Sequence, residues 1–333
     1  PDTRLRVAQR IQAGSVGRAL EPGTAARIFT GAQMPDGAGT VVIQEDVTAS
    51  GATIRVNAAA EKGANIRLRG QDFHEGDAVL HAGTRLNARH ILLAASAGHA
   101  MLACVRRPVV AVLATGDELV EPSDRPMAGQ IVASNSYGLA ALIEAAGGTA
   151  KLIGIARDEP DDLAQKISEA DGADILVTTG GASAGDHDLV RPALKAAGAK
   201  LEFYKIAMRP GKPMFFGKHG TMRILGLPGN PVSSMIGARV FLVPLIARML
   251  GRTDTMSVIK AELTGPVAAN GPRDHYMRGR LDVTTTPPRV TPLPNQDSAL
   301  AAALSEADCL IVNPANTPAL SQGASVSVLN LDF

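Results

Sequence analysis

Residues 174–188 read DILVTTGGASAGDHD, an apolar run that changes abruptly into glycine, serine and aspartate. The apolar part is typical of a buried strand, and HDLVRPALKAAG (187–198) behind it has the apolar spacing of a helix. Glycines let backbone N–H groups converge on an anion, whereas carboxylates such as those of Asp186 and Asp188 attract hard cations. The stretch therefore predicts a strand–loop–helix unit that binds a phosphate-bearing ligand together with a divalent metal.

The same alternation of strand and helix extends over residues 108–252. Apolar runs predict strands, and segments with helical apolar spacing and polar caps predict the helices between them. The expected strands are 109–116, 150–158, 174–181, 200–208 and 224–230, and the expected helices are 134–148, 160–170, 187–198 and 231–251. This pattern indicates an α/β fold with a doubly wound, mainly parallel sheet.

Two segments with a different sequence pattern flank this α/β segment. Residues 1–65 contain short apolar runs between Gly, Pro and Asp turns, which predicts a β-rich module, and 257–333 predict a second small β domain in the same way. Residues 66–107 are expected to be a linker with part of a helical domain. Because the chain begins at Pro1, we expect the N-terminal half of that domain to be missing. A chain of 333 residues is also long enough for several domains.

The composition argues against several classes of protein. The net charge is +1 and aromatic residues make up 3%, with no tryptophan, so neither nucleic acid nor an anionic membrane is an expected partner. No apolar stretch of membrane-spanning length lacks charge. Cys104 and Cys309 form no ligand-type cluster, which favours a reduced, cytoplasmic setting.

Polar side chains follow successive strands of the predicted sheet. In an open α/β sheet the ligand site lies outside the carboxyl ends of the strands. The acids at these ends suit a metal and the bases suit an oxyanion. Each loop taken alone could be only a tight turn or a capped helix, but acids and bases at four successive strand ends favour a site. The residues are Asp117, Glu118, Asp158, Asp186, Asp188, Lys205, Arg209 and Lys212, followed by the loop GLPGNPVSS (226–234).

Familiar dinucleotide and P-loop signatures are absent from the sequence. There is no GxGxxG after a strand and no GxxxxGK[ST]. Dehydrogenases and P-loop NTPases are therefore disfavoured.

With these motifs in order, the chain resembles the molybdopterin molybdenumtransferase family, the MoeA and gephyrin E-domain type. The resemblance covers nearly the whole chain. It runs through RIFTGAQMPDGAGTVVIQED (27–46), NIRLRGQD (65–72), TGDEL (115–119), RDEP (157–160), TGGASAGDHD (179–188), MRPGKP (208–213), GLPGNPVS (226–233), HYMRGRL (275–281) and NQDSA (295–299). It implies an elongated homodimer of four-domain subunits, in which 108–252 is the molybdopterin-binding domain. The family's Ser-x-Met-Asp-Gly-Tyr-Ala motif is not present in this sequence.

The resemblance also implies an activity and site residues. The family inserts molybdate into adenylylated molybdopterin with Mg²⁺, releasing AMP and the molybdenum cofactor. Glu118, Asp158 and Asp188 would hold Mg²⁺, with Lys205 and Arg209 also in the catalytic set. Together with the strand-end loops described above, the expected substrate-binding residues are Thr30, Gly180, Gly181, Ser183, Gly185, Asp186, Lys212, Pro213, Pro228, Gly229, Asn230, Ser233, Arg278 and Ser298. Of these, Lys212, Pro213, Ser233, Arg278 and Ser298, with Arg209, would hold molybdate.

Other interpretations stay open from the sequence. A molybdopterin adenylyltransferase shares the α/β domain, and a scaffold protein related to the gephyrin E domain would need no catalysis. Partner proteins implied by the resemblance are a second copy of the chain, molybdopterin adenylyltransferase and molybdoenzyme apoproteins.

Overall fold

The computed structural model describes residues 2–181, 189–252 and 258–331, and the chain divides into two units, 1–79 and 80–333. The first unit contains one sheet with the strand order β2-β1-β4-β3. Its elements are β1 (Thr3–Ile11), β2 (Thr24–Ile28), the short 3₁₀ helix Gln44–Asp46, β3 (Val47–Ser50) and β4 (Thr53–Val56). The β1–β2 pair is parallel, whereas β1–β4 and β3–β4 are antiparallel.

The second unit starts with helix α1 (Ala88–Ser96). Asn87 caps this helix by accepting hydrogen bonds from the backbone N–H groups of Arg89 and His90. The apolar spacing of ARHILLAASAG (88–98) predicts a helix here, and the structure has it two residues shorter at the carboxyl end.

The centre of the second unit is a six-stranded sheet with the order β10-β12-β13-β9-β5-β8. Its strands are β5 (Val109–Thr115), β8 (Thr149–Ala156), β9 (Ile175–Thr179), β10 (Lys200–Tyr204), β12 (Phe215–His219) and β13 (Met222–Leu227). The β13-β9-β5-β8 pairings are parallel, and β12 runs antiparallel to both of its neighbours. The predicted α/β fold is confirmed, with one antiparallel strand that the sequence analysis did not place.

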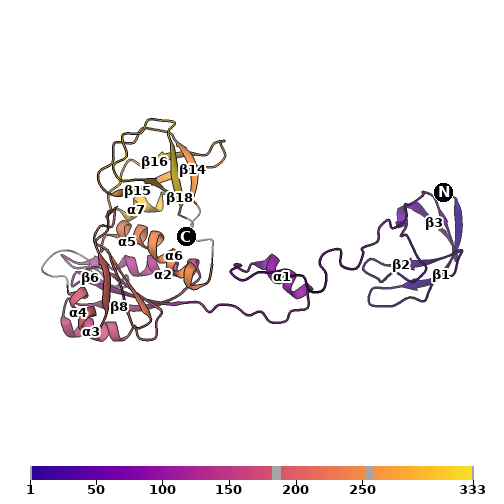
Figure 1. Ribbon diagram of the computed structural model, residues 1–333, viewed down its shortest axis with the longest axis horizontal. Helices are drawn as coiled ribbons and strands as arrows, with labels where there is room; N and C mark the ends of the chain where they lie inside the picture. The colour runs from indigo at the N-terminus through magenta and orange to yellow at the C-terminus, as the bar shows by residue number, and fades with distance from the viewer. Residues whose placement is uncertain (1, 182–188, 253–257, 332–333) are drawn as a thin grey trace. The chain divides into compact units, whose positions relative to one another are not determined.

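Helices cover both faces of this sheet (Figure 1). They are α2 (Ser134–Ala146), α3 (Pro160–Ser168), α4 (Val190–Ala196), α5 (Pro231–Gly237), a π-helical turn (Ala238–Leu242) and α6 (Val243–Met249). The alternation within β5 shows why its sequence is apolar throughout: Ala111 and Leu113 pack with α3 and α4, whereas Val110 and Val112 pack with α2 and α6. A strand that is buried on both faces needs an apolar side chain at every position.

The helical stretch Pro231–Met249 is long and apolar enough, by length and composition alone, to cross a membrane. Its most apolar window is 56% buried inside the protein, and Leu242 and Ile246 belong to the core beneath the central sheet. It therefore behaves as a core helix of the α/β domain.

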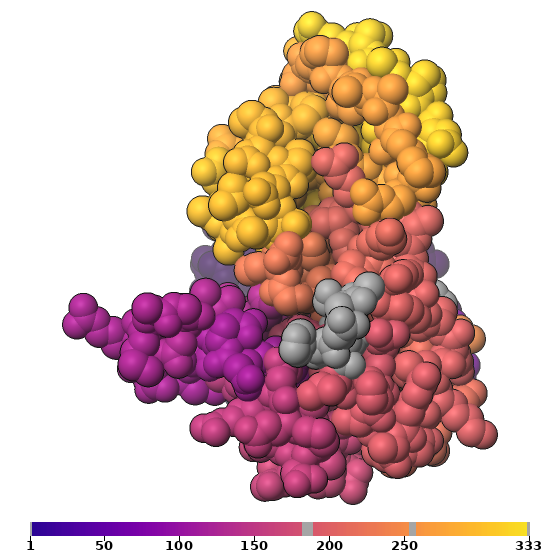
Figure 2. All heavy atoms as spheres, turned by 90° about the vertical axis from the view of Figure 1, so that its left-hand side faces the viewer, coloured from indigo at the N-terminus to yellow at the C-terminus, as the bar shows by residue number. Residues whose placement is uncertain are grey.

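The C-terminal segment forms a second six-stranded sheet with the order β11-β15-β16-β14-β18-β17. The strands are β14 (Val258–Leu263), β15 (Asp274–Asp282), β16 (Arg289–Pro292), β17 (Cys309–Asn313) and β18 (Ser325–Asn330), with helix α7 (Ala301–Ser305) between β16 and β17. Because β17 also pairs with β15, the sheet closes on itself around a core that contains Cys309 and Val328. This closed sheet lies against the α/β domain (Figure 2).

Strand β11 (Met208–Arg209) joins these two domains. It comes from the α/β segment of the chain but pairs in parallel with β15, placing Met208 opposite Asp274 and Arg209 opposite His275. The loop that carries MRPGKP is therefore fixed to the C-terminal sheet.

Candidate functional site

The polar loops that the sequence singled out lie at one edge of the central sheet. Strands β5, β8, β9 and β13 are parallel, so the loops after them emerge at the same edge. Strand β10 runs in the same direction, because β12 is antiparallel to both β10 and β13, which brings Lys205 to this edge as well. The loops also contact one another: the Asp158 backbone N–H donates to Asp117 Oδ1 at 3.1 Å, and Asn135 Nδ2 donates to the Gly229 carbonyl at 2.7 Å.

Gly180 and Gly181 make the turn after β9 with positive φ angles of 90° and 57°. A Cβ on Gly180 would collide with the Thr115 carbonyl, and one on Gly181 would collide with the Val190 side chain. The Gly180 N–H donates to the Leu227 carbonyl at 3.3 Å. The close packing of β5, β9 and α4 therefore accounts for glycine here, and the Gly180 N–H already has a partner within the protein.

Several predicted ligand residues lie outside the described residues. These are Ser183, Gly185, Asp186 and Asp188. Among the residues that the structure describes, no three His, Cys, Asp or Glu side chains cluster as a metal would require. Glu118 and Asp158 follow adjacent strands β5 and β8. This donor set fits Mg²⁺, which binds through one or two carboxylates together with substrate phosphates and water.

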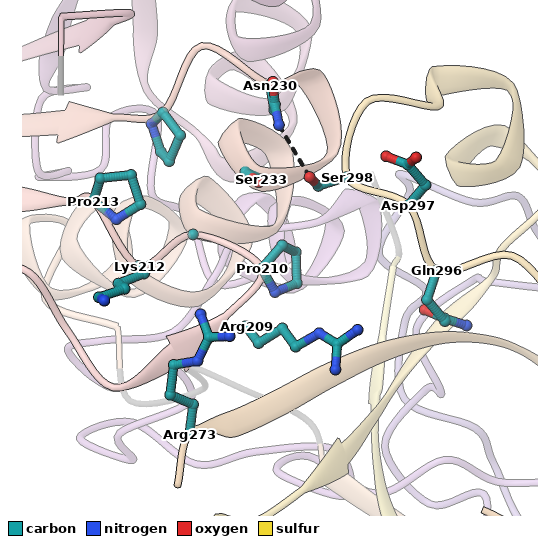
Figure 3. Close-up of a pocket in the computed structure, with 12 residues that line it drawn as sticks. Arg209, Pro210, Lys212, Pro213, Asn230, Ser233, Arg273, Gln296, Asp297 and Ser298 are labelled. Carbon is teal, nitrogen blue, oxygen red and sulfur yellow. Dashed lines mark hydrogen bonds between the residues drawn. The ribbon is translucent and has the colours of Figure 1, made fainter. Parts of the chain in front are cut away.

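A pocket of about 380 Å³ lies where the loops of the α/β domain meet the C-terminal sheet (Figure 3). Its lining combines cations, hydroxyl groups, amides and prolines from both domains. The lining residues are Arg209, Pro210, Gly211, Lys212, Pro213, Pro228, Asn230, Ser233, Arg273, Gln296, Asp297 and Ser298. Seven of the residues proposed from the sequence meet here, namely Arg209, Lys212, Pro213, Pro228, Asn230, Ser233 and Ser298.

Two hydrogen bonds hold the two walls of the pocket together. Asn230, which precedes α5, donates from Nδ2 to Ser298 Oγ at 3.0 Å (Figure 3). The Val232 N–H donates to the Ser298 carbonyl at 3.1 Å. The GNPVS loop therefore positions Ser298, in addition to starting a helix.

The pocket carries more positive than negative charge. Arg209, Lys212 and Arg273 line it, against one carboxylate, that of Asp297. Behind this wall lies His275, which is 8% exposed. Burial, reinforced by the charges of Arg209, Arg273 and Arg278, lowers the pKa of His275 to about 4. The imidazole is therefore neutral at physiological pH, and the positive charge at the pocket comes from Arg209, Lys212 and Arg273. Such a pocket suits an oxyanion.

The resemblance implies that Arg278 holds molybdate, and the structure places this side chain beneath a loop of the pocket. Arg278 is 1% exposed and does not line the pocket. Its guanidinium donates to three backbone carbonyls, those of Asn295 (3.0 Å), Asp297 (2.9 Å) and Leu300 (3.5 Å). Its own backbone exchanges hydrogen bonds of 2.9 Å with the Gln296 side chain. Arg278 thus holds the loop that supplies Gln296, Asp297 and Ser298.

Other pocket residues were not identified from the sequence. Arg273 lies in a turn between strands, where a basic residue looks like ordinary surface charge. Gln296 and Asp297 belong to the NQDSA motif, but only Ser298 was selected from it. Thr30 is exposed in the turn after β2, within the first unit.

Known protein families match the chain in three successive segments. Residues 2–98 match the MoeA N-terminal region (domain I and II), 111–248 a probable molybdopterin binding domain, and 260–331 the MoeA C-terminal region (domain IV). The fold and the pocket thus define a multidomain protein built on a molybdopterin-binding α/β domain.

Individual relatives narrow this class. The molybdopterin molybdenumtransferase of Staphylococcus aureus (strain Mu50) is 32% identical over 328 residues, covering 98% of this chain and 78% of the relative. That of Bacillus subtilis is 33% identical over 333 residues, covering 98% and 77%. That of Nostoc sp. is 37% identical over 284 residues, covering 83% of this chain and 65%, just under two thirds, of the relative. The molybdopterin biosynthesis MoeA protein from Pyrococcus horikosii superposes with a TM-score of 0.84 at 29% identity, covering all of this chain and 82% of that one.

The chain belongs to the molybdopterin molybdenumtransferase family. The family and the molybdenum-transfer function predicted from the sequence are confirmed at this level.

Proposed function

We propose that this chain inserts molybdate into adenylylated molybdopterin in the presence of Mg²⁺, releasing AMP and the molybdenum cofactor. The observation that carries the proposal is the cationic pocket between the α/β domain and the C-terminal sheet, next to the edge where the strand-end carboxylates emerge. A molybdate dianion needs fixed cations and hydroxyl donors. A nucleotide-pterin pyrophosphate needs a carboxylate-bound cation nearby.

Some residues of the site would bind the substrates, and others would orient them. Arg209 and Lys212 attract molybdate, and the hydroxyls of Ser233 and Ser298 orient its oxygens. Glu118 and Asp158, joined by Asp188, would hold Mg²⁺, which would offset the negative charge of the pyrophosphate. Water then hydrolyses the phosphoanhydride bond, so that AMP leaves with one phosphate and the other stays on the pterin. Lys205, at the same edge, offsets charge that develops on the leaving phosphate.

Product analysis tests the proposal and separates it from its alternatives. Purified protein is incubated with adenylylated molybdopterin, molybdate and Mg²⁺, and AMP and molybdenum cofactor are quantified. Release of both supports insertion. ATP consumption with free molybdopterin would select adenylylation, and no turnover with either substrate would favour a scaffold. Omitting molybdate or adding a chelator should each suppress the reaction.

Asp158→Asn is expected to lower Mg²⁺-dependent AMP release by at least about tenfold, because a charge-assisted contact contributes roughly 1.5–3 kcal/mol. The variant keeps the size of the side chain, so its thermal unfolding should stay close to that of the wild type. Asp188→Asn is expected to act in the same way. Turnover at the wild-type rate across a Mg²⁺ titration would remove the substituted residue from the site.

We further infer a cytoplasmic homodimer whose substrates come from a molybdopterin adenylyltransferase and whose product goes to molybdoenzyme apoproteins. The support is the family membership of the chain.

A further inference from the structure

The aromatic ring of Tyr204, the last residue of β10, is in contact with two cations. The guanidinium carbon of Arg191, on α4, lies 3.8 Å from the ring centroid, and Lys205 Nζ lies 4.9 Å from it. The negative face of an aromatic ring attracts a cation that lies within about 6 Å of its centroid. Tyr204 therefore contacts both a helix that covers the sheet and the lysine that follows it in the chain.

The ring of Tyr204 is held by the core of the α/β domain. Tyr204 is half-buried and packs against the apolar cluster that includes Val190 and Leu194 of α4. On the sheet it lies opposite Phe215, whose side chain is fully buried. The ring is therefore a fixed surface rather than a mobile side chain.

The ring, and not the hydroxyl group, makes these contacts. Within residues 2–181, 189–252 and 258–331, the Tyr204 hydroxyl oxygen is buried and has no hydrogen-bond partner. A buried polar group without a partner is unfavourable. The contribution of Tyr204 therefore comes from its aromatic face.

The backbone of Lys205 has an unusual conformation. Its φ angle is 67°, in the left-handed region that is unfavourable for a residue with a Cβ. Two hydrogen bonds fix the chain here: the Lys205 N–H donates to the Met214 carbonyl at 2.8 Å, and the Ile206 N–H donates to the Lys212 carbonyl at 3.1 Å. Such strained conformations persist where the surrounding structure fixes them, and they cluster at functional sites. The bend in the backbone and the ring of Tyr204 together determine where the ammonium group lies.

We propose that Tyr204 is a positioning residue for Lys205, and that its ring holds the lysine ammonium at the edge of the sheet where the reaction takes place. The inference rests on the proposed function, in which Lys205 offsets charge on the leaving phosphate. Lys205 is exposed, and the flexible stem of an exposed lysine otherwise lets the charge occupy many positions. Displacement of a catalytic group by about 1 Å can cost about a hundredfold in rate. A ring that restricts the ammonium therefore favours turnover without touching the substrate.

The first test is a double-mutant cycle on AMP release from adenylylated molybdopterin, with rates normalised to folded protein. Tyr204→Leu removes the aromatic face and is expected to lower kcat by about fivefold to a hundredfold, with little change in KM. In a Lys205→Ala background the same substitution should have no further effect, because the ammonium that the ring positions is absent. A loss caused by weaker packing would appear in both backgrounds. The control is Phe203→Leu, which removes the neighbouring ring that stacks on Phe216 with centroids 5.9 Å apart, and it should match the wild type.

Two further variants separate the charge distribution of the ring from its shape. Tyr204→Phe keeps the ring and loses only the hydroxyl group that lacks a partner, so it should retain most of the activity. Tyr204→pentafluorophenylalanine keeps a ring of similar shape but reverses the charge distribution on its face. It should therefore lose activity as Tyr204→Leu does, and this pair replaces the leucine variant if that variant does not fold.

A second measurement tests the contact without turnover. Methylation of the lysines with ¹³C-labelled formaldehyde keeps their charge and gives each an NMR signal, and the signal of Lys205 is assigned by its loss in Lys205→Arg. The ring current of Tyr204 should shift this signal in the wild type and in Tyr204→Phe. The shift should disappear in Tyr204→Leu.

The outcomes separate the inference from the proposed function. If the wild type releases no AMP, the proposed function fails, and the role of Tyr204 in that reaction fails with it, even where the NMR shift is present. If the wild type turns over, the inference alone is overturned by either of two results. One is that Tyr204→Leu costs as much activity in the Lys205→Ala background as in the wild type. The other is that the Lys205 signal does not depend on the ring.

Discussion

At the scale of single residues, Arg278 does not line the pocket but holds the loop that supplies Gln296, Asp297 and Ser298 to it. A buried guanidinium that donates to three carbonyls fixes the loop 295–300, and its removal leaves those carbonyls without partners. Hydrogen bonds that involve a charged donor contribute roughly 1.5–3 kcal/mol each. We therefore expect Arg278→Ala to lower the free energy of unfolding by about 3 kcal/mol or more. We also expect the variant to lose activity.

Chemical denaturation of the Arg278 variants, compared with Arg280→Ala, checks this prediction. Arg278→Lys should also be destabilised, because one ammonium cannot reproduce the planar donors that reach several carbonyls. Arg280 is exposed and paired at the surface, so its loss should change stability by less than about 1 kcal/mol. Arg278→Ala could instead be as stable as the wild type and differ only in the molybdate concentration that it requires. That result would show that Arg278 contacts molybdate.

The second prediction at this scale concerns His275 and pH. Its pKa falls from 6.5 to about 4 on folding, mainly through burial. Between these two values the unfolded chain binds a proton that the folded protein does not, so the stability present above pH 6.5 is lost as the pH falls toward 4. Since one pKa unit corresponds to about 1.4 kcal/mol, this effect is at most about 3 kcal/mol.

Denaturation at pH 7.5 and at pH 4.5, with wild type and His275→Gln, isolates that contribution. The variant should lose less stability on acidification than the wild type, because its side chain does not titrate. Equal pH dependence in both proteins would show that His275 is not responsible.

At the scale of elements, the turn after β9 combines a conformational and a steric requirement for glycine. Gly180 and Gly181 have positive φ, and a Cβ at either would meet Thr115 or Val190. Gly172 also has positive φ, at 81°, but open space surrounds it. Gly172→Ala should therefore cost only the conformational penalty of about 1–2 kcal/mol, whereas Gly181→Ala should cost more, because Val190 belongs to the core. Thermal unfolding of the two variants compares them directly, and equal losses would show that packing against Val190 adds nothing.

Elements that depend on local pattern were predictable from the sequence, and those that depend on distant pairing were not. The apolar runs of β5 and β9 and the helices between them were predicted, because consecutive apolar residues indicate a strand that is buried on both faces. The side-chain caps expected for these helices are not formed in α2 or α3. Strand β12 was missed, since Gly217 and Lys218 interrupt its apolar pattern. Strand β11 has only two residues and exists through its pairing with β15.

One part of the candidate site could likewise be predicted from the sequence, and another part could not. The loops at the strand ends could be found because each follows a recognisable strand. The second wall of the pocket could not be placed, because the positions of Arg273 and Arg278 depend on how β15 pairs with β11 and β17. Two arginines five residues apart on one segment look equivalent in the sequence. Their difference is burial, which the fold decides.

At the scale of the whole molecule, the domains differ in how much core each encloses. The two flanking β modules are short, at 1–65 and 257–333, so from the sequence we expect neither to bury much core alone, which favours a dimer. For the C-terminal domain this is wrong, because its closed sheet surrounds a core that includes Leu263, Val290 and Ile311. The N-terminal unit differs: among residues 2–79, Ile11 is the one large apolar side chain that is fully buried, at 1% exposed.

The N-terminal unit also leaves apolar side chains in contact with solvent. Val16 is 79% exposed and Leu68 is 73% exposed, with Phe29 and Ile43 at 41% and 44%. A module of this size buries a small fraction of its surface on folding and gains stability from association.

We therefore predict that the chain is a homodimer in solution, and that the second copy covers apolar surface of the N-terminal unit. Sedimentation at micromolar concentration should give twice the mass of the chain, and amide hydrogen exchange in residues 2–79 should become faster on dilution below the dissociation constant. Exchange in residues 109–249 should not change, because that domain has its own two-sided core. A monomer at micromolar concentration, or exchange in the N-terminal unit that does not depend on dilution, would contradict the prediction.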